Sequence, residues 1–194
     1  MTPFKPVALA HASRLINHGP TVLVTSAHDG RRNVMAAAWS MPVEFTPPRI
    51  AVVIDKHTWT RELASAAGGF ALCLPGAGLA TLTHAVGNES GRTVDKFRRH
   101  AIHARPGPVL GMPLIETGCL AWLECRLIRE PHAEDAYDTC FAEVVAAAAD
   151  ERVFSQGRWH LPEDQPALQT LHHLGGGHFV RAGAMISAAG AQPR

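Results

Sequence analysis

The residues best suited to chemistry gather between Lys56 and Ser65, in the sequence KHTWTRELAS. The hydroxyls of Thr58, Thr60 and Ser65 stand at the start of a helical pattern, with Lys56 and Arg61 beside them. A helix N-terminus with such side chains can bind a phosphate, because its free N–H groups and its dipole both favour an anion. The alternative is an ordinary helix cap by Thr58 or Thr60.

A second feature is the small-sided run Ala36–Ala38, which lies within the apolar segment 34–41. Alanine has a weak strand propensity, but small side chains let a flat ligand approach the backbone N–H and C=O groups. The alternative is that these alanines fill a tight core opposite larger residues. Together, the run and the helix start predict a site that holds a flat ring at one end and a phosphate at the other.

Three antiparallel strands and a helix are expected to position these residues. The pair Asp29-Gly30 stands between two apolar runs and is typical of a hairpin. Pro47 and Pro48 end the second run, because proline cannot donate a hydrogen bond to the sheet. The expected elements are strands over 21–25, 34–41 and 49–54 and a helix over 61–67.

Further along the chain, the strand expected over 115–128 alternates clearly. One set of side chains is uniformly apolar and should face the interior, whereas Glu124 and Arg126 should face outward. Thr93 is expected to cap a short helix, and the first ten residues, with two prolines, should be irregular. The other expected elements are strands over 70–74 and 179–181, a helix over 79–86 and a helical turn over 168–174.

Length and composition favour one globular domain over residues 1–194, with flexible ends at 1–10 and 188–194. Apolar residues make up 46% of the chain and charged residues 18%. The net charge of +1, without a basic block, argues against nucleic acid or an anionic membrane as partner. No apolar run is long enough to span a bilayer, and the first residues lack the apolar core of a secretory signal. A cytoplasmic protein is therefore expected.

Several kinds of site find no support in the sequence. The four cysteines form no C-x-x-C pair, and the 12 histidines form no metal-binding motif, so no metal site is expected. The chain lacks a G-x-S-x-G elbow, a P-loop and a Rossmann fingerprint. No side chain stands out as a general acid or base, and we name no catalytic residue.

An ordered set of motifs runs through most of the chain. It comprises Pro20, Thr25, Gly30, Asn33 with Met35, Ala36–Ala38, Trp39, Pro47 with Pro48, Thr58 with Thr60, SGRTVDKF at 90–97, CLAWLECRL at 119–127 and the glycine run before His178 and Phe179. This set resembles the flavin reductase-like, FMN-binding split-barrel family, and within it the flavoredoxin-like branch.

The resemblance implies a mostly β domain with short flanking helices, a Greek-key-like split β-barrel. It makes the alanine- and acid-rich stretch a strand over 139–148, although propensity alone favours a helix there. It also implies a homodimer with two FMN sites at the subunit interface, FAD being an alternative cofactor. NAD(P)H would be a transient reductant that docks over the flavin.

The resemblance further implies which residues contact the flavin. The ring would lie against the backbone of 37–41, and Asn33 would add a hydrogen bond. Thr58 and Thr60 would hold the phosphate, while Lys96 either joins them or belongs to a solvated basic helix. The full set expected to bind the cofactor is Asn33, Ala37, Ala38, Trp39, Ser40, Met41, Lys56, Thr58, Trp59, Thr60, Ser90, Lys96, His178 and Phe179.

Two functions remain open, because the chemistry belongs to the flavin itself. The first is an NAD(P)H-dependent flavin reductase, with hydride transfer to the flavin N5 and a partner oxygenase that uses the reduced flavin. The second is a flavoredoxin-like carrier that keeps its FMN and exchanges electrons with a partner protein. A weaker third possibility is a split barrel that binds another ligand.

Overall fold

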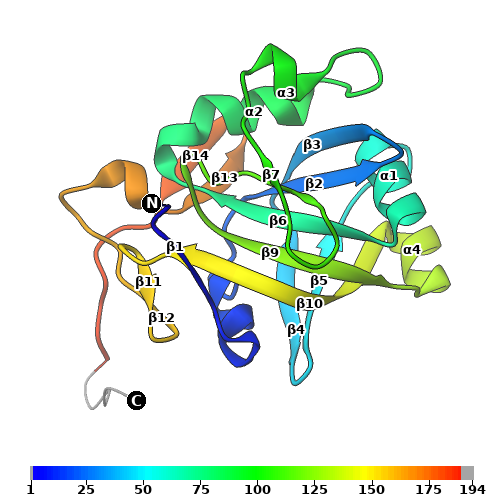
Figure 1. The fold of residues 1–194 in the computed structure, drawn as a ribbon. Helices are drawn as coiled ribbons and strands as arrows, with labels where there is room; N and C mark the ends of the chain where they lie inside the picture. Colours follow the sequence, from blue (N-terminus) through cyan, green and yellow to red (C-terminus); the bar gives the residue numbers. More distant parts are fainter. Residues whose placement is uncertain (1, 189–194) are drawn as a thin grey trace.

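The computed structural model describes residues 2–188, and eight of their strands form one sheet (Figure 1). These strands are β1 (Phe4–Pro6), β2 (Val22–His28), β3 (Arg31–Ala37), β4 (Ser40–Phe45), β5 (Pro48–Val53), β6 (Gly69–Pro75), β9 (Cys119–Ile128) and β10 (Thr139–Asp150). They pair in the order β3-β2-β6-β9-β10-β5-β4, all antiparallel, and β1 pairs with β10. β3 and β4 follow each other in the chain but end this order on opposite sides, so the barrel is split between them.

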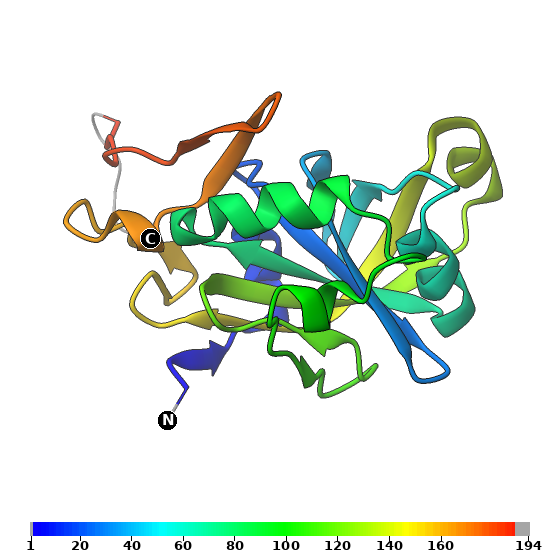
Figure 2. The same cartoon turned by 90° about the horizontal axis from the view of Figure 1, so that it is seen from above.

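Helices and short strands cover this barrel, and the mostly β class expected from the sequence is confirmed. The helices are α1 (Trp59–Ala67), α2 (Ala80–Asn88), α3 (Lys96–Arg99) and α4 (Pro131–Tyr137), with 3₁₀ turns η1 (Leu9–Leu15), η2 (Ala77–Leu79) and η3 (Pro166–Leu168). The short strands are β7 (Arg105–Pro106), β8 (Pro113–Leu114), β11 (Phe154–Ser155), β12 (Arg158–Trp159), β13 (Leu171–Gly175) and β14 (His178–Arg181). Figure 2 shows α2 crossing the sheet, with the hairpin β13–β14 to one side of it.

The turn between β2 and β3 forms as predicted, whereas the strand expected over 34–41 is wrong. Asp29 and Gly30 have φ values of +48° and +73°, as the central residues of a type I′ turn require. β3 ends at Ala37 and β4 begins at Ser40. The run is apolar throughout, but its two halves pair with different strands, because the chain crosses from one end of the sheet order to the other.

Of the two β9 side chains expected to face outward, only one is exposed. Its alternate apolar side chains fill the barrel interior as expected, but Glu124 is fully buried on the other face, while Arg126 is exposed. The Glu124 carboxylate accepts hydrogen bonds of 2.9 to 3.1 Å from the backbone N–H groups of Val109, Leu110 and Met112. A loop thus covers this face of β9, and the carboxylate satisfies the loop's backbone donors.

Four smaller expectations have clear outcomes. The strand expected over 139–148 is confirmed, and so is the helix over 79–86, although it continues through Gly87. The helical turn over 168–174 is wrong because β13 starts at Leu171. The cap of α3 is Asp95, whose side chain accepts from the Arg98 N–H, and not Thr93.

The two ends of the chain were expected to be flexible. Near the N-terminus, Phe4–Pro6 instead pair with β10, and the Phe4 side chain is buried. Proline is tolerated in such a strand, because β1 pairs on one side only. At the other end, all of the segment 188–194 except Ala188 lies outside the described residues.

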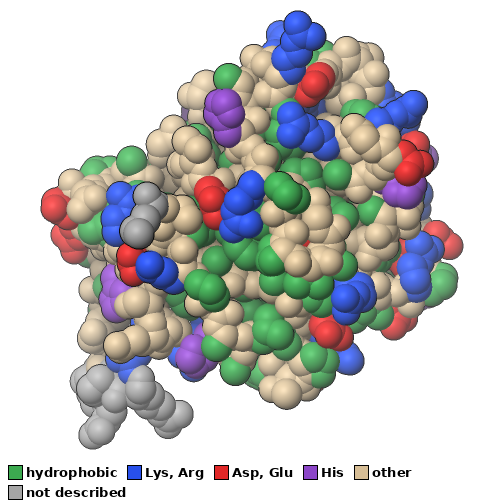
Figure 3. Space-filling model, viewed as in Figure 1, with side chains coloured by type: hydrophobic (Ala, Val, Ile, Leu, Met, Phe, Trp, Pro, Cys, Tyr) green, Lys and Arg blue, Asp and Glu red, His purple; other side chains and the backbone are tan. Residues whose placement is uncertain are grey.

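The surface mixes charges of both signs. Figure 3 shows Lys, Arg, Asp and Glu side chains interspersed around a central apolar area on the face drawn. None of the helices in residues 2–188 combines the length and apolar character needed to cross a lipid bilayer.

Candidate functional site

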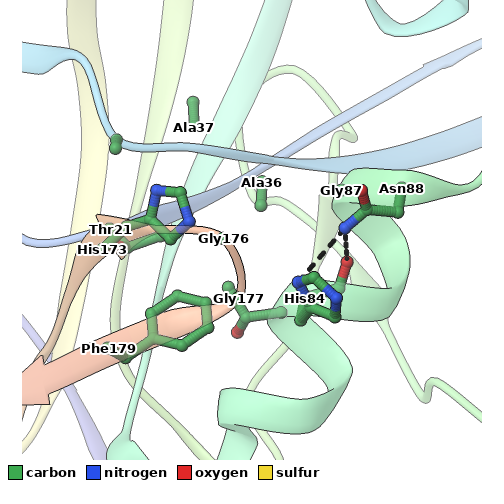
Figure 4. Close-up of a pocket in the computed structure, with 12 residues that line it drawn as sticks. Thr21, Ala36, Ala37, His84, Gly87, Asn88, His173, Gly176, Gly177 and Phe179 are labelled. Atoms are coloured by element: carbon green, nitrogen blue, oxygen red, sulfur yellow. Dashed lines mark hydrogen bonds between the residues drawn. The ribbon is translucent and has the colours of Figure 1, made fainter.

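Three cavities follow one another along β3 and into β4. The first, here the helix-start cavity, has a volume of about 330 Å³ and lies between the N-terminus of α1 and residues 86–92. The second, the hairpin cavity, has about 280 Å³ and lies between β3, α2 and the hairpin β13–β14 (Figure 4). The third, the β4 cavity, has about 320 Å³ and is lined by 38–41 and part of β5. Gly87 and Asn88 line the first two, and Ala38 lines the last two, so neighbouring cavities adjoin; the three together are here called the trough.

The hydroxyls at the start of α1 have structural partners. Thr58 is the N-cap: its Oγ1 accepts from the Arg61 N–H at 3.3 Å and donates to the Asp55 carbonyl at 2.8 Å. Thr60 is fully buried, and its Oγ1 accepts from Asn33 Nδ2 at 2.9 Å. Both threonines, with Trp59 between them, line the helix-start cavity. The N–H groups of Trp59 and Thr60 lie in the first helical turn and so have no intrahelical acceptor.

The two cations expected beside this helix start point elsewhere. Lys56 Nζ donates to the Asp135 carbonyl and lies 3.5 Å from Asp138 Oδ1. Arg61 Nη2 lies 3.0 Å from Glu134 Oε2 in a buried ion pair. Neither cation lines the helix-start cavity. Both tie the region of α1 to α4, whose acidic and carbonyl groups are their partners.

The buried cation that lines this cavity is instead Lys96, at the start of α3, whereas Arg92 lines it as an exposed side chain. The Lys96 side chain is 3% exposed, and its Nζ donates to the carbonyls of Val34 at 2.8 Å and Val86 at 2.7 Å. An ammonium group has three donors, so one remains. Burial lowers the pKa of Lys96 to about 8, and nearby Glu89 opposes this shift. Lys96 is therefore a buried cation that two hydrogen bonds fix in place, and its side chain is not part of a solvated surface helix.

The loop before α3 closes the same cavity. Ser90 lines it, and its Oγ accepts from the Arg92 N–H at 3.3 Å. Arg92 lies on the rim and pairs with Glu62 at 2.8 Å. A side chain at position 91 would bring its Cβ within 2.1 Å of Asn33 Oδ1, so Gly91 is required by this close approach. Sequence reasoning missed Gly91 and Arg92, although the quoted SGRTVDKF motif contains both.

At the β4 end, the trough has both apolar and polar groups. Ala38, Trp39, Ser40 and Met41 line the β4 cavity, and Trp39 is 75% exposed. The Ser40 Oγ is buried and has no hydrogen-bond partner within residues 2–188. Ala37 belongs to the barrel core, as the core reading of the alanine run expects, and it also lines the hairpin cavity; binding of a flat ligand against the run stays a prediction.

Of the two C-terminal residues expected at the site, only one lines a cavity. Phe179 lines the hairpin cavity, and its ring centroid lies 5.1 Å from that of His173. His178 is exposed and does not line the cavity. Figure 4 shows residues that the sequence analysis did not name, among them Thr21 and His84. Their contribution depends on how α2 packs against β3, which no local motif indicates.

The arrangement is that of a known family. A family model described as "Flavin reductase like domain" matches residues 14–170. The chain belongs to this family. The uncharacterized protein YddH of Escherichia coli (strain K12) is 56% identical over 190 residues, which cover 97% of this chain and 100% of that protein.

Solved structures of flavin reductase-like proteins share the fold. An FMN-binding domain of a flavin reductases-like enzyme from Shewanella baltica OS155 is 40% identical, with a TM-score of 0.90 over 95% of this chain and 97% of that one. The flavoredoxin of Desulfovibrio vulgaris (Miyazaki F) is 22% identical, with a TM-score of 0.76 over 89% and 91%. The family match ends at residue 170, before the hairpin β13–β14 that walls the hairpin cavity.

Proposed function

We propose that this flavin reductase-like chain binds FMN in the trough and works as an NAD(P)H-dependent flavin reductase. The observation that carries the proposal is the trough itself. It joins a buried cation beside a helix N-terminus to an unpartnered serine hydroxyl beside a small-sided strand end. FMN has the matching layout, with an anionic phosphate at one end and a flat ring with polar edge atoms at the other.

The phosphate would lie in the helix-start cavity. The third donor of Lys96, the backbone N–H groups of Trp59 and Thr60, and the Ser90 hydroxyl are the groups that would hold it. Charge-assisted hydrogen bonds of this kind contribute about 1.5–3 kcal/mol each. Thr60 and Asn33 act differently from the sequence expectation: they bond to each other, and so fix the start of α1 against β3.

The ring would lie against residues 37–41. Ala38 and Trp39 connect β3 to β4 and belong to neither strand, which leaves backbone groups beside the cavity. The Trp39 carbonyl is used, since it accepts from the Val53 N–H at 3.0 Å. The Ser40 Oγ, which is buried and has no partner within residues 2–188, would turn toward the cavity and bond to a polar edge atom of the ring. Bound flavin would supply the hydride and electron chemistry, and the protein would supply position and exclude water.

We further propose that the protein is a homodimer built on β4. Alternate side chains of the Trp39–Phe45 segment are apolar and exposed, with Trp39 at 75% and Phe45 at 71%. β4 is also an end strand of the sheet. An exposed apolar edge strand usually has a partner. A second copy would cover it and complete the β4 cavity. Use of NAD(P)H would place the protein in the cytoplasm.

The test is the visible absorption spectrum of purified protein, taken before and after loading with excess FMN and desalting. NAD(P)H oxidation is then followed with and without added free flavin. Consumption of NAD(P)H on addition of free flavin supports the reductase, with a partner oxygenase as the user of reduced flavin. Retained FMN without NAD(P)H consumption indicates the flavoredoxin-like carrier. If flavin neither binds nor turns over, the trough serves another ligand.

A further inference from the structure

We propose that Glu89 is an affinity-determining residue of the helix-start cavity: its carboxylate opposes the flavin phosphate and so keeps FMN exchangeable. The inference rests on the proposed function, because it concerns the same phosphate position. Glu89 lines this cavity together with Lys96 and Ser90. Its side chain is 24% exposed, so water and salt screen the charge only in part. A carboxylate is unexpected here, because a site for an anion is normally built from donors and cations.

Glu89 also occupies an unfavourable position of its own helix. It is the C-cap of α2, and the last carbonyls of a helix form the negative end of the helix dipole. A carboxylate beside this end destabilises the helix, whereas a lysine or arginine would stabilise it. Residues that break such a local rule are typical of functional sites. The stability of α2 therefore does not explain a glutamate at position 89.

Two side chains at the end of α3 hold the carboxylate. Glu89 Oε2 lies 2.9 Å from His100 Nε2, and Oε1 lies 3.3 Å from Arg99 Nε. Because an ionised carboxylate can only accept, the imidazole Nε2 carries a proton and donates. The hydrogen bond from His100 is the main cause that lowers the pKa of Glu89, and the charge of Arg99 acts in the same direction. The carboxylate is thus fixed in place and ionised at neutral pH.

The charge of Glu89 reaches the cation that would bind the phosphate. Burial lowers the pKa of Lys96, and Glu89 raises it, so the two charged groups interact. A field that favours the ammonium group disfavours an anion beside it. Lys96 also uses two of its three donors on the carbonyls of Val34 and Val86. With one free donor on the cation and one opposing carboxylate, the cavity binds a phosphate with limited strength.

Limited strength suits a protein that passes reduced flavin to another enzyme. The second cation of the cavity, Arg92, is exposed and pairs with Glu62 at 2.8 Å, so it adds little attraction. A reductase whose product is free reduced flavin has to release it in every turnover, whereas a carrier has to keep it. The Glu89 carboxylate favours release, and an uncharged side chain at this position would favour retention.

The test compares Glu89→Gln with the unmodified protein in fluorescence titrations with FMN and with riboflavin. Glutamine keeps the size and an acceptor for His100, and it removes the charge. We expect the Kd for FMN to fall by about three- to tenfold, as for the loss of one like charge a few ångströms away in a largely aqueous setting. Riboflavin lacks the phosphate, so its Kd should stay the same. Titration at about pH 6.5 keeps Lys96 protonated, since its pKa of about 8 falls further without Glu89.

Salt dependence and two more variants separate the charge from the shape of the side chain. The difference between Glu89→Gln and the unmodified protein should shrink as NaCl rises from about 0.05 to about 0.5 M. Glu116→Gln is the matched control, because Glu116 is 20% exposed and pairs with Arg105 at 2.9 Å but does not line the cavity. It should leave both flavins unchanged. His100→Leu frees the carboxylate and should weaken FMN binding, and this effect should vanish in the Glu89→Gln background.

Several results would overturn the inference while the proposed function stands. One is an FMN Kd that is unchanged or higher in Glu89→Gln. Another is equal tightening of FMN and riboflavin, because the phosphate would then not be involved. A third is an effect of His100→Leu that persists without the Glu89 charge. If neither flavin binds to the unmodified protein or to Glu89→Gln, the proposed function itself fails, and the inference fails with it.

Discussion

Replacing Lys96 with methionine tests the phosphate end of the trough most directly. Methionine keeps most of the buried volume and removes the only Lys or Arg charge that is buried against the helix-start cavity among the described residues. One charge-assisted hydrogen bond contributes about 1.5–3 kcal/mol, which corresponds to a rise of about 10- to 150-fold in the Kd for FMN. Quenching of flavin fluorescence during titration measures this Kd.

Two controls distinguish the loss of the Lys96 charge from damage to the fold. Riboflavin lacks the phosphate, so its Kd should be nearly the same in the variant and in the unmodified protein. Lys56→Met removes a nearby cation that faces α4 instead, and it should leave FMN binding unchanged. Lys96→Met also leaves the Val34 and Val86 carbonyls without a donor, and damage to the fold would weaken both flavins equally. An FMN Kd within twofold of the unmodified value, in a folded variant, would refute the assignment.

Three further predictions address charge, assembly and stability. FMN affinity should fall as pH rises through about 8, because Lys96 then loses the proton that makes it a phosphate partner. The fall should disappear in Lys96→Met. A flat affinity profile for the unmodified protein, titrated between pH 6.5 and 9.5, would show that the reasoning is wrong. If the protein is the proposed dimer, Phe45→Glu should convert it to a monomer in analytical ultracentrifugation, whereas an unchanged dimer mass would exclude β4 as the interface. Glu134→Ala should lower the free energy of unfolding in urea by about 3–5 kcal/mol, since it strands the buried Arg61 charge, while Asp135→Ala on the exposed side of α4 should change it little.

Local chemistry was enough to predict several parts of the fold. The Asp29-Gly30 turn follows from the two positive φ values that only a few residues adopt easily. The Thr58 cap follows from the need of a helix start for a side-chain acceptor. In each case the cause and the effect lie within a few residues of one another.

Other features depend on groups that are distant in the chain. Lys56 and Arg61 were expected at the anion site, but their side chains instead bind the carbonyl and carboxylate groups of α4. Glu124 has the parity of an outward residue, yet the loop over β9 encloses it. Lys96 shows the opposite case: its basic surroundings indicate a solvated helix, and only the family resemblance pointed to a site. The fold makes it a buried cation, because the carbonyls of Val34 and Val86 lie within its reach.

The error in the strand expected over 34–41 falls where the candidate site is richest. A single strand over 34–41 would have continued one ladder through Ala38 and Trp39. Instead, the ladder with β2 ends at Ala37 and a different ladder, with β5, begins at Ser40, whose buried hydroxyl has no partner within residues 2–188. A local departure from regular pairing costs stability and persists when a ligand or partner uses the exposed groups. Under the proposed function, the break between β3 and β4 is therefore the feature that makes room for the flavin ring, and not an accident of barrel closure.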